Sequence, residues 1–375
     1  SLSGGFGFDG DMQAKLDDVR RLLAWVGVSS AQGPGLKALT ASGAFHLSGP
    51  TLTFDDGTFS LDGNKAVGLL AVTAGPRPRV EGTLAFDRLA LAPYLGASQT
   101  EVTQEGGAAS EFSVFDWPLA QNLDADLRIS AGEIDASAFK LGRGAITFTA
   151  KQGVIVGELG ELELCGGSAA GRAGLDLTQA SKRLTLVASL TDIAAESCLQ
   201  QAALDIGLKG VGRLKTDVAT EGRDVAELIK GLSGSLKVTA RDGMVPVDFS
   251  PLLLATIPLE GQSWNRSSGT PFAQLNADCR LAGGHIWCQA FSMQTPSGLI
   301  SGSGDIDLPR QTLDWDVVVA DHADAMQGKQ PVVQDTPKVS IRGSLVQPTI
   351  RRADRSTLGD GGPQAARLAP SVSPH

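Results

Sequence analysis

The chain has 375 residues, of which 42% are hydrophobic and 19% are charged, and its formal net charge at pH 7 is -9. This length and composition are sufficient for one large or two medium domains with a buried core. The negative charge and the lack of a window rich in Lys and Arg argue against nucleic acid as a partner, because phosphate backbones are bound by clustered cations. No apolar stretch reaches the roughly 18 to 20 residues that a membrane-spanning helix requires.

An amphipathic helix is predicted at residues 12–28. Leu16, Val19 and Leu23 recur at helical spacing, while Asp18 and Arg21 fall on the opposite side. Shorter helices are predicted at residues 224–232 and 251–256, the second because Ser250 precedes a proline at the first helical position.

Nearly all of the remaining chain alternates apolar and polar residues with the period of a β-strand. Clear runs begin at Leu123, Ile146, Leu184 and Leu313. Turns are predicted where glycine follows a turn-forming residue, at residues 56–57, 62–63, 152–153, 242–243 and 283–284. The predicted fold is therefore mostly β, an elongated and curved antiparallel sheet with a few short helices.

The composition divides the predicted sheet into two blocks. Residues 1–98 form an N-terminal β block that includes the helix at 12–28, and residues 116–350 form a larger β region. The small, polar residues 99–115 are predicted to be a linker or loop between them. Residues 351–375 accumulate Arg, Gly, Pro and Ala without periodicity and are predicted to be a disordered tail.

A short phrase, apolar-x-Gly-x-apolar, recurs within the strand-like runs, as in Val80 to Leu84 and Leu232 to Leu236. Its glycine falls on the apolar face of the strand, where glycine marks a bend or a close approach. We therefore expect a hydrophobic groove along a curved sheet, partly emptied by these glycines. The candidate groove residues are Val80, Gly82, Leu84, Phe86, Leu127, Ile129, Ile146, Phe148, Leu232, Gly234, Leu236, Ile300, Gly302, Ile341, Gly343 and Leu345.

No catalytic, cofactor-binding or metal-binding residue is predicted. Residues 5–10 match the glycine pattern of dinucleotide-binding loops, but no strand precedes them and no β/α alternation follows. The four histidines are scattered, without a neighbouring ligand at metal-binding spacing. The aspartate pairs at 305 and 307 and at 314 and 316 are interpreted as solvated carboxylates on the outer face of a strand.

Two disulfide bonds are predicted from the four cysteines. Cys279 and Cys288 lie equally far from the turn at residues 283–284, so they are directly opposed in a non-hydrogen-bonded pair of a hairpin. Cys165 and Cys198 are then paired by elimination; the alternative is buried free thiols. Disulfides indicate an oxidising compartment such as the periplasm.

From Leu123 onward, the order of several phrases is similar to that in the AsmA family of Gram-negative envelope proteins. These phrases include residues 164–174, 208–212, 232–243, 284–286, 300–308 and 341–348, and the run at 79–95 in the N-terminal block also resembles this family. Position 165, where the resemblance leads us to expect an aromatic residue, is a cysteine.

The resemblance implies a β-rich periplasmic body held at the inner membrane by an upstream helix, which the sequence does not contain. It also implies a non-enzymatic role in outer-membrane biogenesis, in which phospholipid acyl chains move along a hydrophobic β-groove, with outer-membrane assembly components as further partners. The alternative is a periplasmic scaffold or interaction protein that affects outer-membrane protein assembly without carrying lipid.

Overall fold

The structure is a computed structural model that describes residues 7–25, 35–94, 121–136, 139–202, 207–246, 249, 269–321, 338–345 and 348–352. The predicted linker at 99–115 and the predicted helix at 251–256 lie outside these residues. Of the predicted tail, only residues 351 and 352 are described, and they belong to the last strand.

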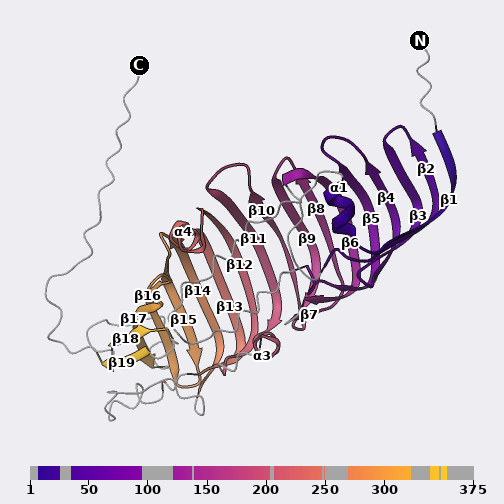
Figure 1. Cartoon of the computed structure of the whole chain (residues 1–375). Helices are drawn as coiled ribbons and strands as arrows, with labels where there is room; N and C mark the ends of the chain where they lie inside the picture. The colour runs from indigo at the N-terminus through magenta and orange to yellow at the C-terminus, as the bar shows by residue number, and fades with distance from the viewer. Residues whose placement is uncertain are drawn as a thin grey trace, which may run out of the picture.

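The described strands form a single sheet of nineteen strands, which Figure 1 shows as one long twisted layer running from the N-terminal to the C-terminal end. The first strands are β1 (Gly7–Leu16), β2 (Leu39–Ser48), β3 (Thr51–Leu61), β4 (Asn64–Thr73), β5 (Arg79–Ala90), β6 (Asp124–Ala136), β7 (Phe139–Leu141), β8 (Gly144–Lys151), β9 (Val154–Leu164) and β10 (Gly167–Asp176). They are followed by β11 (Lys182–Ala194), β12 (Lys209–Gly222), β13 (Ser233–Val245), β14 (Thr270–Ala282), β15 (His285–Thr295), β16 (Gly298–Asp307), β17 (Thr312–Asp321), β18 (Lys338–Ser344) and β19 (Pro348–Arg352).

Strands adjacent in sequence pair antiparallel in the sheet with two exceptions. β7 and β8 do not pair with each other, and β5 and β6 are parallel, so residues 91–123 lead the chain back to the end of the strands at which β5 begins. The short β7 pairs with the end of β6, whose main partner is β8. Because β5 and β6 pair directly, the two β blocks predicted from the sequence share one sheet.

The prediction of a helix at residues 12–28 is wrong over its first part. Residues 12–16 belong to β1, and the helix α1 covers only Val19–Trp25. Met12 and Leu16 have the i, i+4 spacing of a helix, but together with Ala14 they also alternate as in a strand, and β1 pairs with β2 over this stretch. Two further helices, α3 (Ala195–Gln201) and α4 (Val225–Gly231), lie at the ends of strands, before and after β12; α4 confirms the prediction at 224–232, with Asp224 as its N-cap.

Two of the predicted turns are instead irregularities within strands. Asp56 and Gly57 lie inside β3, where the register with β2 and β4 shifts between Phe54 and Gly57. This bulge changes the side-chain alternation, so Phe54 and Phe59 share one face and their rings meet edge to face at 5.5 Å. Residues 242–243 likewise lie inside β13.

A polar cluster fastens one end of the N-terminal strands. Asp62, in the β3–β4 turn, accepts hydrogen bonds from the backbone N–H groups of Leu36 (2.7 Å) and Lys37 (2.9 Å) and from the Tyr94 hydroxyl (2.9 Å). The Asn64 side chain accepts a hydrogen bond from the Ala90 N–H (2.6 Å) and donates one to the Ala90 carbonyl (3.1 Å). The segments before β2 and after β5 are thereby held to the same turn.

Both predicted disulfide bonds are present. Cys279–Cys288 joins opposed residues of β14 and β15, with a Cα–Cα distance of 3.9 Å. Cys165–Cys198 joins the β9–β10 turn to α3, with a Cα–Cα distance of 5.3 Å. The Cys165–Cys198 bond therefore anchors a helix to a turn between two strands, whereas the Cys279–Cys288 bond links two strands that are already paired.

The titration of Tyr94 tests the polar cluster. Burial raises the pKa of Tyr94 to about 12, with a lowering contribution from its hydrogen bond with Asn64 and raising contributions from Asp62. The neutral phenol therefore stabilises the fold fully below pH 10, and this stabilisation is lost as the pH rises from 10 to about 12. Tyr94 is the sole tyrosine, so tyrosinate absorbance reports it directly. If the Tyr94 hydroxyl titrated with a midpoint at pH 10 while circular dichroism showed that the protein was still folded, the burial of Tyr94 in this cluster would be contradicted.

Removal of the disulfides tests their separate contributions. In the chain-entropy model each bond stabilises by about 2 to 4 kcal/mol, and the longer loop contributes more. Separations of 33 and 9 residues make the Cys165–Cys198 bond more stabilising by about 1 kcal/mol. We expect urea unfolding to show this order for the paired Cys→Ser variants. An equal or reversed order would show that local strain or residual structure outweighs loop entropy.

Candidate functional site

Strand pairing aligns apolar residues across the sheet. Leu127 on β6 is paired with Gly82 on β5 and with Phe148 on β8, and paired residues of neighbouring strands point to the same face. From β4 to β14 this row consists of Leu70, Gly82, Leu127, Phe148, Gly157, Ala173, Leu186, Val218, Gly234 and Leu281. The parallel row two residues along consists of Gly68, Leu84, Ile129, Ile146, Leu159, Gly171, Ala188, Thr216, Leu236 and Cys279. We call the face that these two rows share the apolar face.

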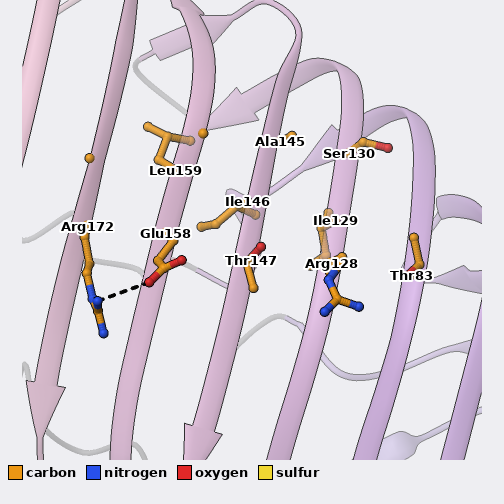
Figure 2. A pocket seen from close by; sticks show the side chains of 12 residues that line it. Thr83, Arg128, Ile129, Ser130, Ala145, Ile146, Thr147, Glu158, Leu159 and Arg172 are labelled. Atoms are coloured by element: carbon orange, nitrogen blue, oxygen red, sulfur yellow. Dashed lines mark ion pairs between the residues drawn. The ribbon is translucent and has the colours of Figure 1, made fainter.

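The opposite face is polar. Figure 2 shows part of it, with Arg128, Glu158 and Arg172 on β6, β9 and β10 beside a hollow of about 590 Å³. Arg172 and Glu158 form an ion pair at 3.3 Å between neighbouring strands. Comparable cross-strand pairs join Arg183 to Glu221 and Arg342 to Asp314. Exposed pairs of this kind contribute roughly 0 to 1 kcal/mol each, so their main effect is to keep this face in water.

Among the residues that the structure describes, no second layer lies over much of the apolar face. The described helices α1, α3 and α4 have no buried residues, and the described strands all belong to one sheet. A cavity of about 480 Å³ lies on this face from β8 to β12, with Leu232 beside it. Its lining includes Phe148, Ile155, Ala173, Leu184, Leu186 and Val218. Leu186 is 42% exposed, although the residues paired with it on both sides, Ala173 and Val218, are apolar. We call the apolar face between β4 and β13 the trough.

Beyond the trough, the same face is filled by its own side chains. Met293 and Ile300 on β15 and β16 are 0% exposed, and Val317 and Val339 on β17 and β18 are 1% and 0% exposed. These residues pack with Phe272 and with Phe249, which lies outside the strands. Strands β14–β18 therefore have a closed core, and we call them the closed section.

The pairing places the predicted groove residues of the strands on the apolar face and its continuation over β14–β18. On β5 these are Val80, Gly82, Leu84 and Phe86, followed by Leu127 and Ile129 on β6, Ile146 and Phe148 on β8, Gly234 and Leu236 on β13, Ile300 and Gly302 on β16, and Ile341 and Gly343 on β18. Leu232 follows α4 and borders the cavity, and Leu345 follows β18. Ile300, however, is fully buried in the closed section, so it does not line an open surface.

The glycines have a different role from the one expected. A Cβ atom on Gly82 would overlap the carbonyl oxygen of Leu69, and one on Gly234 would overlap that of Asp217. Gly302 has the same relation to Asp316. These glycines allow neighbouring backbones to approach closely, as a strongly curved sheet requires, and do not leave space for a ligand. Gly343 differs, since its nearest contact is 3.9 Å away, but its φ of +109° still favours glycine.

The centre of the cavity was not among the predicted groove residues. Gly157, Ala173, Leu186 and Val218 lie outside the apolar-x-Gly-x-apolar phrases that defined the candidates. The alternation from Leu184 to Leu190 does place Leu186 on the apolar face, so a signal existed for that residue. The alternation of apolar and polar residues does not show which part of a strand face is covered by other side chains.

The model of the AsmA family matches residues 37–291, which extend from just before β2 into β15. The chain belongs to the AsmA family. This membership associates it with the cell envelope. Among curated proteins and solved structures, none matches this AsmA-family chain.

None of the helices in the part of the chain that the structure describes is both long and apolar enough to cross a membrane. In the same part of the chain, no cluster of three or more His, Cys, Asp or Glu side chains could hold a metal ion.

Substitution of Gly234 tests the close approach of β12 and β13. Gly234→Ala places a Cβ against the Asp217 carbonyl at a residue whose φ is +141°, so we expect a loss of more than about 1 kcal/mol in unfolding free energy. Gly75→Ala is the matched control, because no atom lies within 4 Å of its added Cβ and its φ lies outside the glycine-favouring range. Equal stability of the two variants in urea unfolding would contradict the assigned role.

Proposed function

We propose that this AsmA-family protein is a non-enzymatic cell-envelope protein whose trough shields phospholipid acyl chains from water during transport between the inner and outer membranes. Through this activity it supports outer-membrane assembly, with assembly components as further partners. Its proposed location is the periplasm, held at the inner membrane by an upstream helix. Family membership supports this location, and the two disulfide bonds are compatible with an oxidising compartment.

The open part of the apolar face is the observation that supports the proposal most directly. Exposed Ala173 and Leu186 lie at the centre of a cavity whose remaining lining is almost entirely apolar. Contiguous exposed apolar surface is characteristic of sites that bind lipid, an apolar ligand or another protein. Here the apolar rows cross the strands, so the surface runs along the sheet and fits an elongated ligand.

The energetics favour an acyl chain as that ligand. Each CH₂ group that leaves water for an apolar environment gains about 0.8 kcal/mol. A bare acyl chain therefore meets a large barrier in an aqueous compartment, and a continuous apolar surface lowers it. The two rows that define the trough contain no charged side chain, so they provide no recognition of a particular headgroup.

The second candidate function is that of a scaffold, and the closed section is the observation that favours it. The side chains of β14–β18 fill their own face as those of an ordinary β-domain do. If the trough were also covered in the cell by a protein partner, the exposed apolar residues would form a binding interface and not a lipid path. The two functions differ in whether phospholipid accompanies the purified protein.

Paired substitutions at adjacent residues distinguish these functions. Leu186 and Val187 are neighbours on β11 and are 42% and 51% exposed, but they point to opposite faces. We expect Leu186→Asp to lose co-purifying phospholipid, measured by mass spectrometry, because a carboxylate against an acyl chain must be desolvated. Val187→Asp, the control, should retain the lipid.

The parent protein must carry phospholipid for this comparison to apply. Absence of lipid from gently purified parent protein, or equal lipid in both variants at unchanged melting temperature, contradicts the shielding function. Lipid loss in both variants with lowered melting temperatures would indicate a general effect of charge on the strand. In that case Leu186→Asn and Val187→Asn replace the aspartate pair, and equal lipid content in those two folded variants also contradicts the proposal.

A further inference from the structure

The apolar face differs in openness along its length. Near the N-terminal end, Phe8 on β1 is 63% exposed, and Leu47 on β2 and Val72 on β4 are also exposed. The face remains open at Leu186 on β11. From β14 onward, Met293, Ile300, Val317 and Val339 on the same face are almost completely buried, and Ile286, Ile306, Leu313 and Trp315 are half-buried. The change occurs within one continuous sheet, so it reflects the side chains and not a break in strand pairing.

Aromatic residues account for much of the filling. The Trp315 ring lies against Gly304 on the neighbouring strand and meets the Phe291 ring edge to face at 5.3 Å. Phe272 on β14 packs into the cluster formed by Met293, Ile300, Val317 and Val339. An acyl chain could occupy this face only by displacing these close-packed side chains, which are costly to disturb.

Phe249 covers this core from outside the strands. It is 6% exposed and packs in the same cluster, and its backbone N–H donates a hydrogen bond to the Thr270 hydroxyl at 2.8 Å. Thr270 is the first residue of β14 and lies at the other end of that strand from Cys279 and Leu281, which continue the two rows of the trough. The cover therefore lies over one end of the strands of the closed section.

We propose that the closed section is a stop at the C-terminal end of the trough. Acyl chains enter and leave the protein upstream of β14, across an edge of the sheet or at its N-terminal end, and do not continue along β14–β18. This inference rests on the proposed function, because it assigns where along the sheet the lipid path ends. The proposed stop means that the lipid path is closed at its C-terminal end, unlike a conduit that is open at both ends.

Photocrosslinking of the wild-type protein tests the stop without any substitution. The probe is phosphatidylcholine with a diazirine in one acyl chain, supplied in vesicles to the full-length protein, and labelled peptides are identified by mass spectrometry. We expect labelled peptides from β8–β12 and no label above background on β15–β17. Labelling of β15–β17 at a yield similar to that of β10–β12 overturns the stop. Absence of label on every peptide contradicts the proposed function itself, and the stop with it.

Truncation of the cover provides a gain-of-labelling test. Phe249→Ala opens a cavity beside Met293 and Ile300, so we expect label to appear on β15 and β16. Leu47→Ala is the control, because it removes a similar apolar side chain from the open end and should leave β15 and β16 unlabelled. A Phe249→Ala protein that keeps its disulfides and a cooperative melting transition, yet remains unlabelled there, overturns the assignment of Phe249 as the cover.

Discussion

The alternation of side chains along each strand, kept in phase from strand to strand by the pairing register, is the constraint on which this structure depends. A slip of one residue would move every apolar side chain of a strand to the opposite face. The irregularities preserve this phase. In a regular strand, Leu190 and Ile193 would point to opposite faces because they are three residues apart. The register of β11 shifts between them, and Asp192 takes a φ of +53°, so both Leu190 and Ile193 point to the apolar face. The bulge in β3 has the same effect on Phe54 and Phe59.

A sheet whose apolar face is largely uncovered by the described residues must obtain its burial in another way. In most antiparallel sheets the apolar face packs on a second layer. Here, burial is concentrated in the closed section and in a second cluster of Ala125, Ala150, Ile155 and Leu177, against which Leu228 of α4 packs. The second cluster overlaps the trough, since Ile155, Phe148 and Leu184 also line its cavity. Within the trough, a buried residue such as Ala150 therefore lies close to an exposed one such as Leu186, so part of the face stays exposed beside packed side chains.

Most of the fold follows from local sequence, whereas the extent of the open surface does not. Alternation is sufficient to place Leu127, Phe148 and Gly234 on one face, and the symmetry of Cys279 and Cys288 about a glycine turn gives their pairing. The burial of Ile300 and the exposure of Leu186 depend on which residues come from distant parts of the chain, such as Phe249. Residues 12–16 could not be assigned locally either, because their spacing suits both a helix and a strand, and only pairing with β2 decides between them.

The parallel pairing of β5 and β6 has a consequence for the order of folding. The other main pairings join neighbours in sequence, most of them through short turns, so they require little loop closure. The β5–β6 pairing requires closure of the loop formed by residues 91–123, so it is entropically slower to form. Two meanders can therefore form independently, β1–β5 and β6 onward, and a complete apolar face exists only after they join. Completion of the apolar face is in this sense a docking step between two preformed halves.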